Sequence, residues 1–341
     1  MSKYRNNEMS KNTTSRQHSP SLKEKRVFRG LPFGHPCPMR GGITPMPTGL
    51  RGLGGESLCL ILFFVLSLFS CSDEELDSKS VFVDRTTMEK PFDKWIYENY
   101  VMPYNIDLKY HLEDRETDFQ YTLVPAQTEN SIKVAHVVLY CWLEAYDEVA
   151  GVDFTRQYVP KVIQLVGSNA HNKKGTVVMG TAENGMKVTL YAVNFFKTDR
   201  ATLNTYFQIM HHEFTHILTR NKEYDTEFRT ISDGDYITGD WSNKFESESL
   251  AAGFITPYAM SEYNEDFAET LSYYLIYTAT QWKSKMTLAG EEGAAIITRK
   301  IELIRKYMKT AWEIDIDELR DVLQRRINDV VAGKIDITSV E

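Results

Sequence analysis

The pattern of apolar and polar positions predicts a long amphipathic helix over residues 200–221, preceded by an N-cap at Thr198-Asp199. With His212 set to zero and roughly 100° of rotation per residue, the apolar side chains fall between roughly 140° and 240°. His212, His216 and Glu213 lie on the other side, at roughly 0°, 40° and 100°. The apolar stripe consists of Leu203, Phe207, Met210, Phe214, Ile217 and Leu218. One side of this helix therefore packs into a core while the other presents three polar side chains.

Both helix and strand patterns surround this segment. An apolar run at 131–149 predicts a helix, and the run at 161–168 predicts a buried strand. Two β-rich runs follow, joined at Asn184-Gly185, which is a strong hairpin signal because both residues tolerate positive φ. The second run alternates apolar and polar residues over 186–193 and predicts a half-exposed strand. A further helix follows within 256–282, capped by Ser261 or Asn264.

These elements predict an α+β fold with a small mixed sheet. No repeat or low-complexity linker interrupts the chain after Pro91, so residues 91–341 are expected to form one domain. The stretch 221–249 is aromatic, acidic and long for a connection, which predicts that it forms the wall of a pocket.

Charge divides the chain at about residue 70. Residues 1–70 carry 10 Lys/Arg and 3 Asp/Glu, a net charge of +7, whereas the remainder carries 29 and 44, a net charge of −15. The acidic part lacks the positive field that neutralises phosphates, so we expect no nucleic-acid partner.

The first 70 residues resemble a targeting sequence rather than part of a fold. Ser57–Cys71 has an apolar run of the length of a signal-peptide core, and it is too short to span a bilayer. It ends in Leu68-Phe69-Ser70-Cys71, which resembles a bacterial lipobox with Phe69 where a smaller residue is usual. We therefore expect residues 1–70 to be removed, Cys71 to be lipidated, and 71–90 to form a tether. The alternative, a buried core helix, fits poorly with the acidic run that follows at Ser72-Asp73-Glu74-Glu75, which resembles a cell-surface export signal of Gram-negative lipoproteins.

Cysteine usage agrees with this processing. Of Cys37, Cys59, Cys71 and Cys141, only the last two would survive cleavage, and Cys71 would carry lipid, so no intramolecular disulfide is expected. Cys141 lies in an apolar helical run and is predicted to be a small buried hydrophobe. His136 lies in the same run and is expected to be a core histidine rather than a ligand.

The segment His212-Glu213-Phe214-Thr215-His216 matches the pattern HExxH. On a helix its two histidines lie one turn apart, within reach of one tetrahedral Zn²⁺. Glu213 would lie beside the metal, where it could take a proton from a bound water. His211 points elsewhere on the helical wheel and is not expected to be a ligand. The competing interpretation is an exposed His/Glu face on an ordinary amphipathic helix.

A catalytic zinc needs a third protein ligand and an open position. The metzincin pattern HExxHxxGxxH fails because Thr219 stands in place of the glycine and Lys222 in place of the third histidine. An aspartate from 232–240 remains a minor alternative.

The helix within 256–282 offers a better ligand. Glu265 and Glu269 are four residues apart and share one face. Glu265 would bind the metal, and Glu269 would accept a hydrogen bond from a ligand histidine and fix its orientation. Asp266 is the fallback ligand. Alternatively, both glutamates are surface carboxylates near a helix N-terminus, where negative charge is favourable.

The motifs around these ligands resemble those of a known family. "HHEFTHIL" followed by "NEDFAE" is similar to the gluzincin arrangement, with ExxxE where thermolysin-like enzymes have ExxxD. Together with "YNIDLKY", "VGSNAHNKKGTVVMGTAENGMKVTLYAVN" and "GFITPYAMSEYNEDFAE", these motifs resemble the substrate import-associated zinc metallohydrolase lipoproteins, within the zinc-binding metallopeptidases, over about residues 91–280. The resemblance implies a zincin-like fold and an outer-membrane lipoprotein of a Gram-negative bacterium. It also implies association with a TonB-dependent transporter and its ligand-binding lipoprotein.

The predicted function is zinc-dependent hydrolysis of a peptide or glycoprotein substrate. His212, His216 and Glu265 would hold one catalytic Zn²⁺, and Glu213 would act as general base. By analogy with zincins, the strand at 186–195 would lie beside the cleft and pair with an extended substrate. Candidate oxyanion stabilisers are Tyr258, Tyr263 and Tyr273.

Two other functions remain open. The first is a non-catalytic lipoprotein in which a zincin scaffold captures substrate for a transporter; the intact Glu213 argues against it, because a binding protein needs no base there. The second is a structural zinc, although a glutamate among three ligands suits an open site better. Trp241 and Trp282 could bind ligand, but packing is the expected role.

Overall fold

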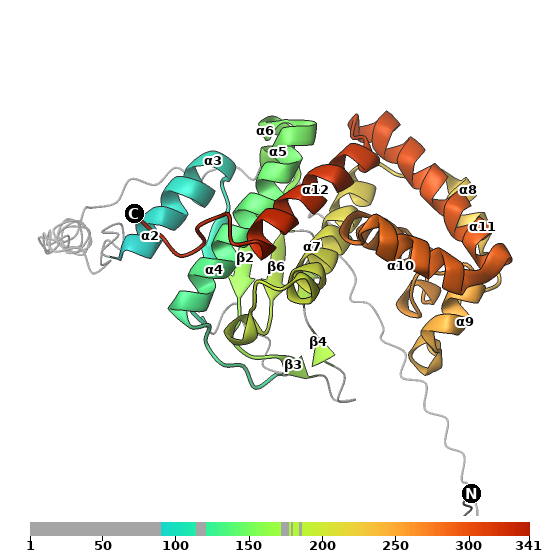
Figure 1. Ribbon diagram of the computed structural model, residues 1–341, viewed down its shortest axis with the longest axis horizontal. Helices are drawn as coiled ribbons and strands as arrows, with labels where there is room; N and C mark the ends of the chain where they lie inside the picture. The colour runs from blue at the N-terminus through green and yellow to red at the C-terminus, as the bar shows by residue number, and fades with distance from the viewer. Residues whose placement is uncertain (1–89, 114–120, 172–176, 179, 184–185) are drawn as a thin grey trace, which may run out of the picture. The chain divides into compact units, whose positions relative to one another are not determined.

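The computed structural model describes residues 90–113, 121–171, 177–178, 180–183 and 186–341 (Figure 1). All of these belong to one compact unit, Val81–Glu341. Within this described part, no helix has the length and apolar character needed to cross a membrane. The predicted signal peptide, the lipidation site Cys71 and the tether up to residue 89 lie outside the described residues.

Two helical segments, separated by the strand β1 (Asp107–Lys109), form the first part of the unit. The first segment comprises α2 (Pro91–Ile96), the π-helical turn η2 (Tyr97–Val101) and α3 (Met102–Tyr104), and it ends where Asn105 adopts a left-handed conformation. The predicted helix at 131–149 is confirmed, and it runs further at both ends. It comprises α4 (Thr128–Val138), the π-helical turn η4 (Leu139–Leu143) and α5 (Glu144–Ala150), and it is followed by α6 (Val152–Tyr158).

A four-stranded mixed sheet lies beside these helices. Its order is β1 (Asp107–Lys109), β2 (Val162–Leu165), β6 (Lys187–Leu190) and β5 (Gly180–Glu183). The first three strands run parallel, and β5 pairs antiparallel with β6. A separate antiparallel pair is formed by β3 (Ala170–His171) and β4 (Val177–Val178). The predicted α+β class with a small mixed sheet is confirmed.

The prediction of a half-exposed strand at 186–193 is wrong. The four residues of β6 are all buried, and the strand ends at Leu190, after which Ala192 adopts a left-handed conformation and η5 (Val193–Phe195) begins. Both faces of the sheet are covered at β6, with α7 among the elements that contact it, so its polar residues are buried as well as its apolar ones. The predicted turn at Asn184-Gly185 lies outside the described residues, although the strands on either side of it do pair antiparallel.

The predicted long helix is α7 (Arg200–Asn221). The Asp199 carboxylate accepts a hydrogen bond from the Thr202 amide at 2.9 Å, which confirms the N-cap. Each member of the predicted apolar stripe is buried in the main core. This burial fixes the rotation of α7 and therefore the direction in which its polar face points.

The second half of the chain is helical. In Figure 1, α10 (Tyr263–Ile276) lies beside α7, and the helices on the far side of α10 from the sheet include α8 (Thr226–Ile231), α9 (Glu246–Ala251) and α11 (Ala279–Trp312). The helix α12 (Ile316–Val331) packs against α5 and α10. Two short 3-10 turns, η6 (Trp241–Asn243) and η7 (Tyr258–Met260), lie in the connection before α10.

Neither predicted cap of α10 is correct. Glu262 occupies the N-cap position without a side-chain cap bond, and the Asn264 amide instead donates to the Glu262 carboxylate. The Ser261 hydroxyl donates to the Tyr258 carbonyl within η7, so it is not available to α10.

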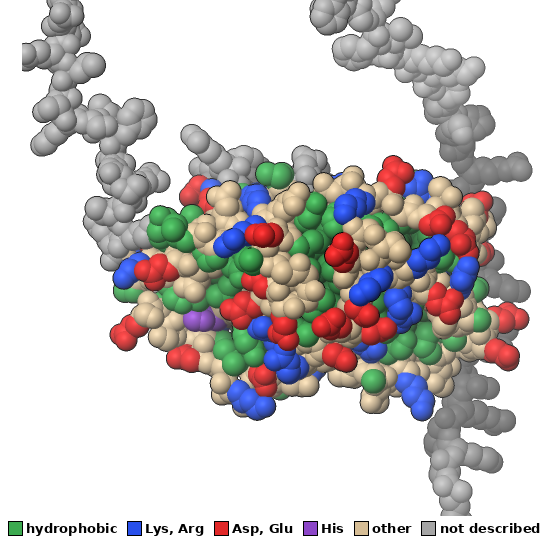
Figure 2. Space-filling view, turned by 90° about the horizontal axis from the view of Figure 1, so that it is seen from above, with side chains coloured by type: hydrophobic (Ala, Val, Ile, Leu, Met, Phe, Trp, Pro, Cys, Tyr) green, Lys and Arg blue, Asp and Glu red, His purple; other side chains and the backbone are tan. Residues whose placement is uncertain are grey.

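Acidic and basic side chains are interspersed over the face shown in Figure 2. They are not separated by sign into one basic and one acidic area. This mixture limits the electric field that the face can present to a charged partner.

A buried ion pair ties α10 to α11. Lys300 Nζ lies 2.7 Å from Asp266 Oδ2, and both side chains are fully buried. The Lys300 ammonium also donates to the Gly253 carbonyl at 2.8 Å, while the Tyr236 hydroxyl donates to the Asp266 carboxylate at 3.0 Å. Burial raises the pKa of Asp266 and lowers that of Lys300, and each charge counteracts the shift of the other.

Replacement of Lys300 by methionine would leave the Asp266 charge buried without its cation. We expect the free energy of unfolding to fall by about 3–5 kcal/mol, because an uncompensated buried charge is strongly destabilising. Chemical denaturation of the two proteins measures this difference. The matched control is Lys334→Met, which removes an exposed lysine paired with Asp329 at 2.9 Å; an equal loss of stability in the two variants would contradict the expected importance of the buried pair.

Candidate metal centre

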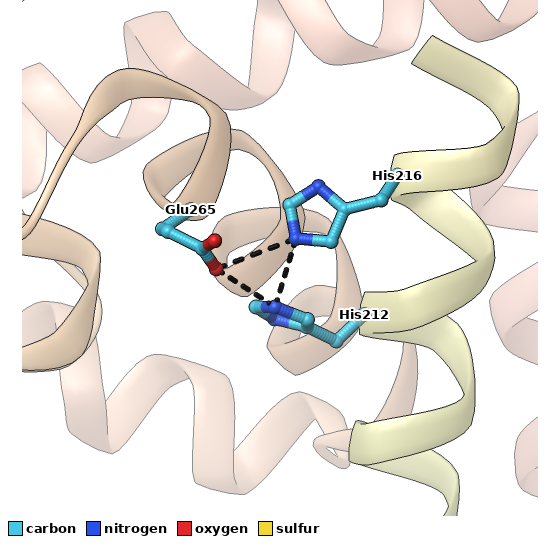
Figure 3. A group of neighbouring side chains, drawn as sticks. All are labelled: His212, His216 and Glu265. Atoms are coloured by element: carbon cyan, nitrogen blue, oxygen red, sulfur yellow. Dashed lines mark hydrogen bonds and ion pairs between the residues drawn. The ribbon is translucent and has the colours of Figure 1, made fainter. Parts of the chain in front are cut away.

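Three side chains from two helices converge on one point. His212 and His216 project from α7, and Glu265 projects toward them from the first turn of α10 (Figure 3). Glu265 Oε2 lies 2.9 Å from His212 Nε2 and 3.3 Å from His216 Nε2. The two histidine Nε2 atoms lie 3.1 Å apart. The three predicted metal ligands are therefore brought together by the fold.

The geometry of these donors suits zinc. A tetrahedral Zn²⁺ with bonds of about 2.0–2.1 Å places neighbouring ligand atoms about 3.3–3.4 Å apart. The three observed separations, between 2.9 and 3.3 Å, are close to this spacing. Two imidazoles and one carboxylate are the ligands of an open zinc site with a fourth position left over, so the residues fit the metal that the sequence predicts.

Glu269 contacts His212 at Nδ1, the ring nitrogen that does not face the other two ligands. Its Oε1 lies 2.8 Å from His212 Nδ1 and accepts a hydrogen bond from the Gln208 amide at 2.7 Å. Its Oε2 accepts a hydrogen bond from the Thr256 hydroxyl at 2.6 Å. A carboxylate held at both oxygens fixes the His212 ring so that Nε2 points at Glu265, which is the arrangement that orients metal-bound histidines.

The pKa shifts show that negative charge predominates here. Burial lowers the pKa of His212, but hydrogen bonding to Glu265 and Glu269 outweighs burial and raises this pKa to about 10. Burial alone would raise the pKa of Glu265, yet His212 and His216 hold it well below its ordinary value. Two carboxylates facing the same imidazole favour a positive charge between them, and a bound cation would supply it.

Glu213 lies on the same helix but outside the group of three. It is partly buried, and this burial raises its pKa above the ordinary value, against the opposing effect of His212 and His216. A carboxyl with a raised pKa can exchange a proton nearer to neutral pH, which is what a general base requires.

The fallback ligands are placed elsewhere. Asp266 is engaged by Lys300 and Tyr236 within the core, because one residue along the helix turns its side chain by roughly 100° away from Glu265. Among the described residues, no aspartate from 232–240 belongs to a group of potential metal ligands.

The two histidines and the cysteine that were not expected to bind metal are all engaged in packing or hydrogen bonding in the fold. His211 is buried on another face of α7, with Nδ1 3.0 Å from the Tyr146 hydroxyl, and burial lowers its pKa to about 3. His136 is partly buried with its ring 4.1 Å from that of Trp95, and its Nε2 lies 2.7 Å from the Ser339 carbonyl. Cys141 is buried and free.

Of the three candidate tyrosines, Tyr258 is the one beside the centre. Its ring lies 6.0 Å from that of His212, and burial followed by the Glu265 charge raises its pKa. Tyr263 instead faces the guanidinium of Arg229, and Tyr273 packs against Tyr277.

The two tryptophans also differ in their surroundings. Trp241 packs edge-on against Tyr258 at 4.9 Å, so it supports a residue next to the centre. Trp282 packs edge-on against Tyr274 at 5.0 Å. Packing is therefore what both side chains do in this structure.

Sequence reasoning missed Gln208 and Thr256, the two donors that hold Glu269. Gln208 precedes His212 by one helical turn, so its place on the polar face of α7 was a usable signal. Thr256 lies in a connection before η7, and its hydroxyl also accepts a hydrogen bond from the Ala259 amide. No spacing rule predicts such a contact from sequence.

A cavity of about 340 Å³ adjoins the centre. It extends between α7, α8 and α10, and its lining includes His216 and Glu265. Glu223, Tyr224 and Arg229 also line it. The prediction that 221–249 forms a pocket wall is therefore confirmed for the first part of that stretch.

The prediction that the strand at 186–195 pairs with substrate is wrong. β6 already has β2 on one side and β5 on the other, so its backbone groups are engaged in the sheet. In the described sheet β5 is the edge strand on this side, and a chain that extended the sheet here would add to β5.

With this geometry established, similarity to other proteins identifies the family. The model of a family described as "Putative zinc-binding metallo-peptidase" matches residues 85–317. The chain belongs to this family. A crystal structure described as a putative zinc-binding metallo-peptidase from Bacteroides caccae is similar as well, with 45% sequence identity and a TM-score of 0.67. The similarity covers 77% of this chain and 100% of that chain. No curated protein matches.

Family membership confirms the predicted relationship to zinc-binding metallopeptidases. The converging donors and the family description agree on zinc as the metal. Lipid anchoring and the link to import stay predictions.

Metal analysis of variants tests the three ligands. Substitution of His216 by alanine removes one of three donors, and we expect the purified protein to lose the roughly one zinc per chain that the site geometry allows. Glu269→Gln keeps the ligands and weakens the support of His212, so we expect zinc affinity to fall about 10- to 100-fold. Elemental analysis after dialysis and competition with a chelator measure both effects.

Two controls match these variants in chemistry. His136→Ala removes a histidine that contacts Trp95 and Ser339, and Glu292→Gln removes an exposed carboxylate of α11. Both should retain zinc with unchanged affinity. Full zinc binding in His216→Ala would refute the ligand assignment.

Proposed function

We propose that this protein is a zinc-dependent peptidase with a gluzincin-like ligand set of His212, His216 and Glu265. The observation that carries the proposal is the convergence of these three donors beside a carboxyl, Glu213, that is not among them. A site built only to hold a metal for structure has no need of a partly buried, unliganded carboxyl with a raised pKa.

The chemistry divides between metal and protein. When bound, one zinc ion would supply a Lewis acid that lowers the pKa of a water molecule toward about 7. Glu213 would take a proton from the attacking water and deliver it to the amine nitrogen of the leaving group as the peptide bond breaks. Glu269 would keep His212 in place during the reaction, because both oxygens of its carboxylate are fixed by neighbouring side chains.

Tyr258 is our choice of oxyanion stabiliser. Its ring is close to that of His212, and the pKa shift of its hydroxyl keeps the proton in place at neutral pH, so it can donate a hydrogen bond. The substrate would be a peptide or a glycoprotein.

Glu213→Gln tests the role of the base. The change removes the proton acceptor and leaves all three zinc ligands in place, so we expect zinc content to be unchanged. The rate of peptide hydrolysis should fall by roughly 100- to 10,000-fold, the usual contribution of a general base. The measurement is zinc analysis together with cleavage of a peptide library followed by mass spectrometry.

The outcome also separates the two functions considered from sequence. A zinc-loaded protein that cleaves no peptide, with or without Glu213, would favour a binding lipoprotein that captures substrate for a transporter. Loss of hydrolysis in Glu213→Gln with zinc retained would exclude it.

We further propose that Cys71 anchors the protein by lipid to the outer membrane of a Gram-negative bacterium, at the cell surface. The lipobox-like residues 68–71 and the acidic run after them support this. In this position the enzyme would act beside a TonB-dependent transporter and its ligand-binding lipoprotein. Isolation of such a transporter together with the tagged protein from detergent-solubilised membranes would test the partnership.

Cys71→Ser should abolish lipidation. We expect the wild-type protein to incorporate labelled fatty acid and to float with membranes, and we expect the variant to do neither. Protease added to intact cells should degrade the wild-type protein if it faces outward. Cys141→Ser is the matched control, since that thiol is buried in the fold; equal labelling of Cys71→Ser and wild type would refute the anchor.

A further inference from the structure

The cavity beside the metal centre contains a fixed arginine. Arg229 of α8 is partly buried, and its guanidinium carbon lies 4.9 Å from the ring centre of Tyr263 and 5.3 Å from that of Tyr224. The Tyr224 hydroxyl is itself held by Asn264 at 2.9 Å. Contacts with aromatic faces stabilise a guanidinium in one orientation while they leave its edge free to donate.

The protein uses only part of the donor capacity of Arg229, whose guanidinium hydrogen-bonds the Tyr224 side chain. Its Nε is buried and has no hydrogen-bond partner in the described part of the chain. Burial of an unsatisfied charged donor is costly, and such a group in a native fold indicates a water molecule or a ligand as its partner.

A second arginine lines the same cavity. Arg220 lies in the last turn of α7, seven residues after Glu213 and therefore on the same side of the helix. Across the described residues, neither Arg220 nor Arg229 has a carboxylate within ion-pair distance. Other arginines of the fold do have one, including Arg305 with Asp317 at 2.9 Å and Arg326 with Glu144 at 2.9 Å.

Two carboxylates besides Glu265 also line the cavity, and neither forms an ion pair with these arginines, although Arg220 does interact electrostatically with Glu213 on its own helix. Glu223 is exposed at the rim, where solvent screens its charge. The Glu262 oxygens lie 3.3 and 3.4 Å from the Asn264 amide that donates to them. Of the two guanidinium groups, that of Arg229 is the more buried, and among the described residues no carboxylate forms an ion pair with it.

We propose that Arg229, assisted by Arg220, binds a carboxylate of the substrate next to the metal centre. The proposal rests on the peptidase function proposed above and specifies its substrate class. A planar guanidinium matches a carboxylate through two parallel hydrogen bonds. A volume of about 340 Å³ is at the small end of ligand sites, which suits one or two residues flanking the cleaved bond.

The carboxylate can come from two sources that share this chemistry. It is either the free C-terminus of a short peptide or the side chain of an aspartate or glutamate near the cleaved bond. In the first case the enzyme removes residues from the C-terminal end, and in the second it cleaves beside acidic residues.

Two peptide libraries distinguish these sources. N-acetylated pentapeptides are prepared once with free C-terminal carboxylates and once as C-terminal amides, and cleavage by the zinc-loaded protein is quantified by mass spectrometry. We expect either the acids to be cleaved about 10- to 100-fold faster than the amides, or the amides with Asp or Glu to be preferred over those with Asn or Gln by that factor.

In Arg229→Gln, the ratio of the cleavage rates of the carboxylate substrates and their neutral counterparts should fall close to one. The preference is a ratio measured within one protein, so it does not depend on how much of the variant is folded. Arg220→Gln should reduce it less, because this side chain is exposed. The matched control is Arg325→Gln, an exposed arginine of α12 paired with Glu148, which should keep the wild-type ratio. No preference for carboxylates, or a preference that Arg229→Gln leaves unchanged, would overturn the proposal.

A binding measurement separates failure of this proposal from failure of the peptidase function. Ligand-detected NMR with zinc-loaded Glu213→Gln compares N-acetyl-phenylalanine with its amide, and N-acetyl-glutamate amide with N-acetyl-glutamine amide. Direct binding of a carboxylate to zinc is common to Glu213→Gln and the double variant Glu213→Gln/Arg229→Gln, so only their difference reports on Arg229. Tighter carboxylate binding that is lost in the double variant supports the subsite even if no peptide is cleaved. Equal binding by the two variants refutes it.

Discussion

The contact between α7 and α10 is the constraint on which the site depends. One histidine of α7, His212, meets two glutamates of α10 that lie one turn apart, with Glu265 at Nε2 and Glu269 at Nδ1. These two contacts of His212 fix how each helix is rotated about its axis and how far one helix is shifted along the other. The apolar stripe of α7 and the buried side of α10 fill the core behind the contact, so the polar residues have a single direction left in which to point. Charge in this position is tolerated because each carboxylate oxygen of Glu269 has a partner.

Much of this arrangement could be predicted from sequence because helical periodicity is a local property. The 3.6-residue repeat places His212 and His216 on one face of a helix, and the four-residue spacing does the same for Glu265 and Glu269. Neither placement depends on the rest of the chain. The choice of Glu265 over Asp266 also follows from geometry. The two side chains diverge by roughly 100°, and Asp266, which faces the core, pairs with the buried Lys300, 34 residues further along the chain.

What could not be predicted depends on packing between segments far apart in the chain. Alternation in 186–193 indicated one exposed face, but both faces of β6 are buried in the fold, and β2 and β5 pair with its two edges. Because its backbone groups are already paired with these strands, β6 cannot pair with an extended substrate. The caps of α10 failed for a similar reason, since Ser261 was already used by η7 and Asn264 turned to Glu262. Local preference decides such positions only where no nearby segment competes for the same hydrogen bonds.

Consecutive residues of α10 connect the metal centre to the interior of the fold. Glu265 faces the histidines of α7, and Asp266, on another side of the same turn, faces Lys300 of α11. A change in the position of this turn therefore alters both contacts at once. Occupancy of the centre and global unfolding become thermodynamically linked, because a ligand that binds the folded state alone draws the equilibrium toward it by mass action. The concentration of free zinc around the protein would then regulate its lifetime as well as its chemistry.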